Sequence, residues 1–276
     1  MKQHFQSQNR PKTGYNKSYY NNYNKKQGYY KSKPQYNKIR NTNEHIDPYT
    51  AQMILYRAEM YILLRYPYLI NLNSKNEKIL DSINEHCNFF IIKSFSEEDV
   101  HKAIKYNVWT STKIGNQTLN NAYKKCKENG GDVYLFFSSN GSGRYVGVAK
   151  MKSEVNLNQV FPYWTQDNKW GGLFDIEWVF IKDVPFSSFK DVVFTLKDGE
   201  KKCVTNSRDT QEIPCKEAKN MLEIIKKYEN TNTLLEHFEY YDMRQENYEK
   251  NNPQLLEQIK LNKEKIRKEE EKQQKE

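Results

Sequence analysis

Short apolar runs alternate along the middle of the chain with segments whose apolar residues recur every three or four positions. The runs predict buried strands at 88–93, 133–138, 144–151 and 174–182, and the NGSG sequence between the second and third strands is typical of a hairpin turn. The helical spacing predicts helices at 49–65, 74–86, 96–106 and 118–129. It predicts a further helix within 212–227 that starts near Pro214. Strands that alternate with helices and are joined by hairpins predict a mixed α/β fold, in which a sheet curls into a small barrel packed by helices.

The two ends of the chain differ in composition from this middle part. Residues 1–45 consist mainly of Asn, Lys, Tyr, Gln and Ser, and such a segment buries too little apolar surface to offset its ordering entropy. We therefore predict a disordered tail at 1–45, a helical extension at 46–86, a folded domain at 87–235 and a charged helical or frayed tail at 236–276. The overall mean hydropathy of −1.00 is consistent with long unpacked segments.

The net charge of +9 comes from the N-terminal tail. Residues 1–40 hold ten Lys and Arg and no acids, which leaves 34 basic and 35 acidic residues, or −1, for the remainder. Seven tyrosines interleave with these lysines, so the tail is suited to stacking on bases while neutralising phosphates. A solvated low-complexity linker is the alternative interpretation, and the sequence does not separate the two.

Several function classes find no support in the residues. The four cysteines have no CxxC spacing and the five histidines never pair at metal-ligand spacing, so we expect neither a metal nor a cofactor. Gly141-Ser142-Gly143 is explained as a hairpin turn, and no nucleophile, base or phosphate-binding loop is identifiable, which predicts a protein that is not an enzyme. The apolar stretch 53–70 contains Arg57, Glu59 and Arg65, so we predict no membrane span.

Three tryptophans stand beside small polar or glycine residues instead of inside apolar runs. Trp109 precedes Thr-Ser-Thr, Trp170 precedes two glycines, and five residues separate Trp164 from Trp170. This setting favours aromatic walls of a pocket, with ordinary core tryptophans as the alternative. Trp178 lies within the apolar run FDIEWVFIK and is predicted to be a core residue.

Four runs carry a resemblance to a known family. They are FFIIKSFSEEDVHKAIKYNVWTST, YLFFSSNGSGRYVGVAKM, WGGLFDIEWVFIKDVPF and VTNSRDTQEIP, in that order between Phe89 and about Glu229. This stretch resembles the YTH domain, the family that reads N6-methyladenosine in RNA, and its wording is closer to the cytoplasmic readers than to the nuclear ones. The resemblance implies a β-barrel packed by helices.

The resemblance also implies a set of site residues. Trp109, Trp164 and Trp170 would form a cage around the methylated base, and the Thr110 backbone carbonyl would accept the remaining N6–H. The other implied contacts are Asp99 at the N1 edge, Phe95 and Asn140 along the base, and Lys93 and Arg208 at phosphates. The chain departs from the cytoplasmic readers in having Phe95 where they usually have Tyr, and in a spacer between Trp164 and Trp170 that is one residue longer.

The predicted function is therefore that of a monomeric reader of N6-methyladenosine in single-stranded RNA. An uncharged methyl group gains no cation–π attraction, so a box of aromatic faces must recognise it by contact and by expelling water. Such a reader would recruit mRNA-processing or decay machinery, with protein partners bound through the tails, in the cytoplasm or alternatively the nucleus. Two alternatives remain: a protein-interaction scaffold without base selectivity, and a binder of another methylated base, including one in DNA.

Overall fold

The computed structural model describes residues 48–73, 77–166, 169–196, 198–229, 233–254 and 257. The described residues from Tyr49 onward belong to one compact unit. The predicted disordered tail at 1–45 lies outside the described residues, as does most of the predicted charged tail beyond Pro253. Within the described residues, no helix combines the length and the apolar character needed to cross a membrane.

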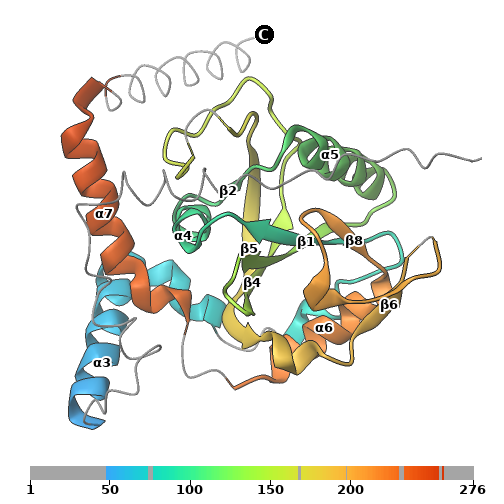
Figure 1. The fold of residues 1–276 in the computed structure, drawn as a ribbon, viewed down its shortest axis with the longest axis horizontal. Helices are drawn as coiled ribbons and strands as arrows, with labels where there is room; N and C mark the ends of the chain where they lie inside the picture. Colours follow the sequence, from blue (N-terminus) through green and yellow to red (C-terminus); the bar gives the residue numbers. More distant parts are fainter. Residues whose placement is uncertain are drawn as a thin grey trace, which may run out of the picture. The chain divides into compact units, whose positions relative to one another are not determined.

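A mixed six-stranded sheet forms the centre of the unit (Figure 1). Its order is β2 (Val108–Trp109), β5 (Phe174–Pro185), β4 (Arg144–Met151), β3 (Val133–Ser139), β1 (Asn88–Ser94) and β8 (Gln211–Ile213). Only β1 and β3 pair in parallel, and the other neighbours are antiparallel. The register between β4 and β5 shifts at two places, and such irregularities bend a strand and increase its twist. The predicted mixed fold with a curled sheet is therefore confirmed.

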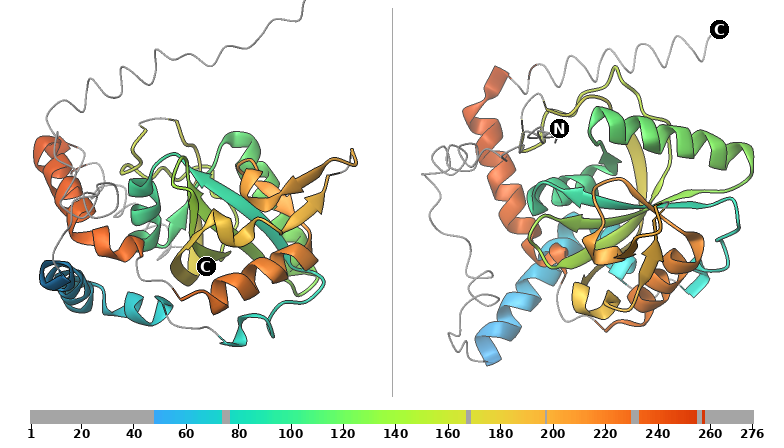
Figure 2. Two further views of the ribbon diagram at one scale, coloured as in Figure 1. Left: turned by 60° about the horizontal axis from the view of Figure 1, so that its bottom comes forward. Right: turned by 45° about the vertical axis from the view of Figure 1, so that its right-hand side comes forward.

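Two apolar cores lie on the two faces of this sheet. Successive residues of a strand point to opposite faces, so Phe90 and Ile92 of β1 belong to one core and Phe89 and Ile91 to the other. The first core is covered by α3 (Pro48–Arg65), α4 (Glu97–Tyr106), α5 (Lys113–Glu128) and α7 (Phe238–Asn251). The second is covered by α6 (Cys215–Lys227) and the 3-10 turn η3 (Phe186–Phe189). A separate two-stranded ribbon, β6 (Val193–Thr195) with β7 (Lys201–Cys203), projects from the unit (Figure 2).

Most predicted elements are confirmed, including the four strands and the helices at α3, α4 and α6. The Ser96 hydroxyl accepts a hydrogen bond from the Asp99 amide, which is the predicted N-cap of α4. The predicted helix at 118–129 begins at Lys113 instead of Thr118, because the Thr112 side chain caps it by accepting from the Gly115 amide, and it is labelled α5. The remaining connections include the 3-10 turns η1 (Pro67–Asn73), η4 (Val204–Asn206) and η5 (Leu234–His237).

The predicted helix at 74–86 is wrong over its described part. Only the 3-10 turn η2 (Glu77–Ile79) forms, followed by turns. The Ser82 hydroxyl bonds to the Ile79 carbonyl, and the Asn84 side chain accepts from the His86 amide and donates to the Gly130 carbonyl. These side chains offer the backbone an alternative to helical hydrogen bonds, and the segment follows them.

Helices α3 and α7 lie together on one side of the unit (Figures 1 and 2), joined by a buried carboxylate. Asp242 of α7 is 2% exposed and accepts hydrogen bonds from the Tyr61 hydroxyl (2.8 Å), the Tyr66 hydroxyl (2.6 Å) and the Lys105 ammonium (2.8 Å). His101 Nε2 lies 3.3 Å from the same carboxylate. Burial alone would raise the pKa of Asp242, but the donors from His101, Lys105 and Tyr66 outweigh it and hold the pKa well below its usual range.

We expect Asp242→Ala to lower the free energy of unfolding by about 3–5 kcal/mol, because it removes a buried acceptor and leaves the half-buried donors of Tyr61, Tyr66 and Lys105 without their partner. A carboxyl with a lowered folded-state pKa stabilises above the unfolded pKa of about 3.9 and loses that contribution as the pH falls further. The variant should therefore also show a shallower loss of stability below about pH 4. Urea unfolding at several pH values measures both effects.

The matched control is Glu246→Ala, a substitution in the same helix as Asp242. It breaks an exposed ion pair between Glu246 and Arg65 of α3 (3.8 Å). This pair should contribute less than about 1 kcal/mol. An Asp242→Ala variant as stable as the control would contradict the assignment of Asp242 as the junction of α3, α4 and α7.

Candidate functional site

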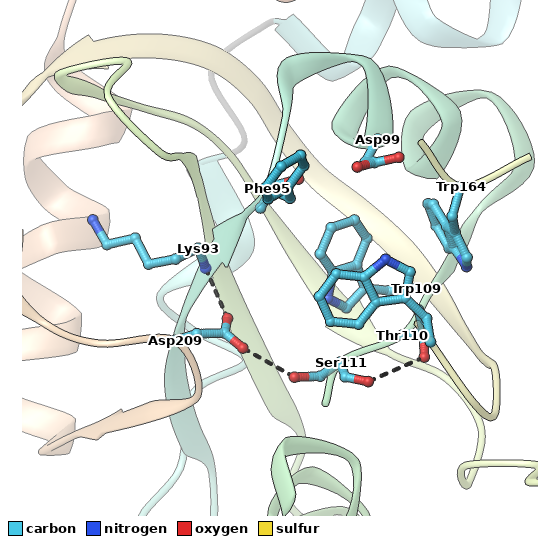
Figure 3. A pocket seen from close by; sticks show the side chains of 10 residues that line it. Lys93, Phe95, Asp99, Trp109, Thr110, Ser111, Trp164 and Asp209 are labelled. Atoms are coloured by element: carbon cyan, nitrogen blue, oxygen red, sulfur yellow. Dashed lines mark hydrogen bonds between the residues drawn. The ribbon is translucent and has the colours of Figure 1, made fainter. Parts of the chain in front are cut away.

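A small pocket lies beyond the end of β1, between the N-terminus of α4, strand β2 and the loop that precedes β5 (Figure 3). Seven of the nine predicted site residues line it, together with three that sequence reasoning missed: Lys93, Phe95, Asp99, Trp109, Thr110, Trp164 and Trp170, with Ser94, Ser111 and Asp209. The predicted residues Asn140 and Arg208 are exposed and do not line the pocket. Asn140 lies close to its edge, since its amide donates to the Ser94 carbonyl at 3.0 Å.

Local backbone geometry delivers Trp109 to the pocket. Asn107 ends α4 in the left-handed conformation (φ 54°), which Asn tolerates better than most residues. The chain reverses there into the short strand β2, where Trp109 pairs with Phe174 of β5. The tryptophan is thereby fixed against the sheet by backbone pairing as well as by its ring.

The tryptophans meet edge to face. The ring centroids of Trp109 and Trp164 lie 5.4 Å apart at an interplanar angle of 76°, and Trp109 packs on Phe137 at 5.0 Å and 82°. These two indoles are only 6% and 7% exposed. They are therefore pocket walls and core members at once, so the two interpretations of the sequence do not exclude each other.

The other two tryptophans differ from this pair. Trp170 is half-buried, and the Lys169 ammonium lies 4.6 Å from its ring centroid. Trp178 is 3% exposed, packs on Phe137 at 4.7 Å and donates from Nε1 to the Ala103 carbonyl. It does not line the pocket. The prediction of Trp178 as a core residue is thus confirmed.

The pocket is narrow. Its volume is about 20 Å³, which is room for one group of the size of water. A buried donor faces the site without a protein partner: among the described residues, none accepts a hydrogen bond from Trp109 Nε1. Buried polar atoms are nearly always satisfied in folded proteins, so this donor is available to a water or a ligand in the pocket.

Asp99 ties the loop of residues 156–173, which carries Trp164 and Trp170 and which we call the tryptophan loop, to α4. Its Oδ1 accepts from the Thr165 amide (2.8 Å), and its Oδ2 accepts from the hydroxyls of Thr165 (2.6 Å) and Ser96 (2.9 Å). Burial raises the pKa of Asp99, and the donors from Thr165 partly offset this effect. Because Thr165 adjoins Trp164, the carboxylate fixes one wall of the pocket.

Asp209 performs a parallel task on the opposite side of the pocket. Its carboxylate accepts from the Lys93 amide (2.8 Å) and the Ser111 hydroxyl (3.0 Å), which joins the segment before β8 to β1 and to the residues after Trp109. Burial raises its pKa as well. The signal for Asp209 and Ser111 was present in the sequence, because both lie in runs that carry the family resemblance.

The Lys93 side chain points away from the pocket (Figure 3). Its ammonium lies 4.5 Å from the Phe186 ring centroid and 3.5 Å from the Thr205 carbonyl oxygen. Burial lowers the pKa of Lys93. The site as a whole offers aromatic walls, backbone groups and two hydrogen-bonded carboxylates, and the described residues contain no group of three or more His, Cys, Asp or Glu that could hold a metal ion. Aromatic walls and hydrogen-bonding groups of this kind are suited to binding a ligand by direct contact.

Comparison with known proteins finds one family profile and similar proteins from the same family. The YTH (YT521-B-like) domain profile matches residues 87–226. The chain is 48% identical over 181 residues to human YTH domain-containing family protein 2, covering 66% of this chain and 31% of that relative. It is 45% identical over 177 residues to mouse YTH domain-containing family protein 1, covering 64% of this chain and 31% of that relative. The chain thus spans about a third of the length of these relatives.

A solved structure is also similar. The crystal structure of the Pho92 YTH domain in complex with m6A aligns with a TM-score of 0.50 and 37% sequence identity. The alignment covers 53% of this chain and 91% of the Pho92 chain.

We expect Asp99→Ala to accelerate hydrogen exchange at the Thr165 amide roughly fivefold to tenfold, because that amide loses an acceptor whose net contribution is about 1 kcal/mol. Exchange measured by NMR on the free protein tests this. The matched control is Asp209→Ala, which removes a similar carboxylate that accepts from one amide and one hydroxyl but does not contact Thr165. Equal exchange at Thr165 in both variants would show that Asp99 does not hold the loop.

Proposed function

The chain belongs to the YTH domain family, whose profile matches just over half of it, and we propose that its pocket binds N6-methyladenosine in single-stranded RNA. The observation that carries the proposal is the edge-to-face pair of Trp109 and Trp164 around a pocket of methyl size. The similar Pho92 domain was crystallised in complex with m6A, which supports the same ligand here. The domain would act by binding and not by catalysis.

The size of the pocket supports a methyl group as the recognised feature. A base in single-stranded RNA can be splayed out and stacked on aromatic rings, with its edges read by hydrogen bonds. Burying one methyl group contributes only about 0.8 kcal/mol by area. Larger discrimination requires a close fit. A narrow space between indole walls provides that fit, because it has no room for the water that an unmethylated amine would hold.

Each predicted residue has a proposed role in this arrangement. Trp109 and Trp164 enclose the methyl group, and Trp170 covers the outer side of the base. The backbone carbonyl of Thr110 accepts the remaining N6–H, and Phe95 lines the base. Asp99 serves the N1 edge through a bridging water, since its oxygens already accept from Thr165 and Ser96.

Asn140 and Arg208 lie outside the pocket lining, and Lys93, which belongs to the lining, directs its side chain away from the pocket. We propose that Lys93 and Arg208 meet phosphates, which position the strand without identifying the base, and that Asn140 contacts the base from the rim. By similarity to the much longer relatives, we also propose that the bound RNA is handed to mRNA-processing or decay machinery in the cytoplasm, through segments other than the pocket.

We expect Trp109→Ala and Trp164→Ala each to remove most of the preference for methylated over plain RNA. Base–aromatic stacking contributes about 1–3 kcal/mol per contact, which corresponds to a loss of about 5- to 150-fold in affinity for the methylated strand. Fluorescence anisotropy with paired oligonucleotides measures this. The control is Trp178→Phe, which alters a core indole away from the pocket and should keep the preference. Full preference in either alanine variant, with a folded protein, would disprove the cage.

We expect Lys93→Ala and Arg208→Ala to weaken binding of methylated and plain RNA by the same factor. Each should also reduce the slope of log affinity against log salt by about 1, because fewer counterions are released. Titrations at several salt concentrations measure the slope, with Lys227→Ala on α6 as a control for the loss of one positive charge. A change confined to methylated RNA would contradict the phosphate role.

A further inference from the structure

Helix α7 lies outside the segment that matches the family profile, yet it contacts the loop that carries Trp164. The Gln245 amide of α7 donates to the Tyr106 hydroxyl at 2.6 Å. Glu249, one turn further along, accepts from the same amide at 2.8 Å. Burial and the nearby Glu249 carboxylate together raise the pKa of the Tyr163 hydroxyl. Two residues of α7 thus lie beside two tyrosines, one at the end of α4 and one in the tryptophan loop.

Three rings connect these contacts, and we call Tyr106, Phe161 and Tyr163 the aromatic bracket. Tyr106 and Tyr163 stack with centroids 5.7 Å apart and planes 8° from parallel. Phe161 packs edge-on against both, at 5.1 Å from Tyr106 and 5.4 Å from Tyr163. All three are half-buried, so the bracket is a packed cluster and not a chance surface contact.

The bracket ends on the wall of the pocket. The Phe161 ring lies 4.7 Å from Trp164 at an angle of 56°. On its other side, Trp164 is fixed through Thr165 by Asp99. The loop that carries Trp164 has little regular structure of its own, the described exception being the bridge between Asn156 and Leu173. The position of the indole therefore depends on these two side-chain supports.

We propose that Tyr163 is a positioning residue for base recognition, and that α7 acts through it and the rest of the bracket to hold Trp164 against Trp109. The proposal rests on the proposed function, because the bracket matters only if these indoles enclose the base. A wall fixed before binding costs no ordering entropy when the ligand arrives, so the gain should appear in the affinity for the ligand that needs the closed cage. Plain RNA, which gains less from the cage, should lose less.

The test compares Tyr163 with Tyr61, a matched tyrosine of α3 that contacts α7 at another place. Both are half-buried, and the hydroxyl of each is influenced by an α7 carboxylate: Tyr61 donates to Asp242, and Glu249 helps to raise the pKa of Tyr163. Tyr163→Ala should reduce the ratio of affinities for methylated and plain RNA by about two- to tenfold, as expected from the loss of an aromatic pair. Tyr61→Ala should lower the melting temperature as much or more but leave the ratio unchanged.

Milder variants keep the test valid if an alanine variant does not fold. Tyr163→Phe retains the stack and should lose less of the ratio than Tyr163→Ala. Glu249→Gln keeps an acceptor for the Gln245 amide, which holds Tyr106, and should retain the ratio, whereas Glu249→Ala should lower it. A merely structural role would not distinguish these two substitutions by the ratio.

The outcomes separate this inference from the proposed function. If the unaltered protein binds methylated and plain RNA equally, the proposed function fails. If it prefers methylated RNA but the Tyr163 variants behave like the Tyr61 variants, or the two Glu249 variants are indistinguishable, the role of the bracket is disproved. A loss of the ratio specific to Tyr163 and Glu249→Ala, with Trp109→Ala as the reference for a lost cage, establishes it.

Discussion

The hydrogen bonds between Asp99 and Thr165 are the interaction on which the shape of the pocket depends. The tryptophan loop spans residues 156–173, and its described part has no strand or helix to fix it between the ends. Polar side chains of the neighbouring helices replace such regular structure: Asp99 of α4 at Thr165, and Asn116 of α5, which donates to the Gly171 carbonyl at 2.7 Å. A pocket wall made of large rings on an irregular loop is thereby given a defined geometry by a few short polar contacts.

Polar side-chain contacts also fix the position of α4. The acidic first turn of this helix is held by cations from two directions, Arg144 of β4 at Glu97 and Arg244 of α7 at Glu98. Acids at a helix N-terminus also interact favourably with the helix dipole. The helix therefore presents Asp99 to the loop at a position determined by both the sheet and α7, which connects pocket geometry to elements distant in sequence.

The parts of this arrangement that the sequence predicted are those that apolar pattern and resemblance determine. The strands were found because β3 and most of β1 are buried on both faces and appear as unbroken apolar runs. Helix α7 was expected only as part of a charged helical or frayed tail and not as a packed element, since its buried face includes Asp242 and Gln245, polar residues that both accept from the Lys105 ammonium of α4. Periodicity analysis counts apolar residues and does not detect such a face. Asp209 was missed for a related reason: its partner Lys93 lies 116 positions away, and only the folded sheet brings them together.

The parallel pairing of β1 with β3 has a consequence for when the site comes into existence. Residues 95–132 form the connection between these two strands, and Phe95, Asp99, Trp109, Thr110 and Ser111 all lie within it. Closing a connection of this length costs chain entropy that only the completed strand pair returns, so such pairings form slowly during folding. The remaining wall, on the loop before β5, is still further along the chain. A partly synthesised or partly folded chain therefore holds no competent pocket, and the ability to recognise a ligand is acquired cooperatively, in the same step that completes the sheet.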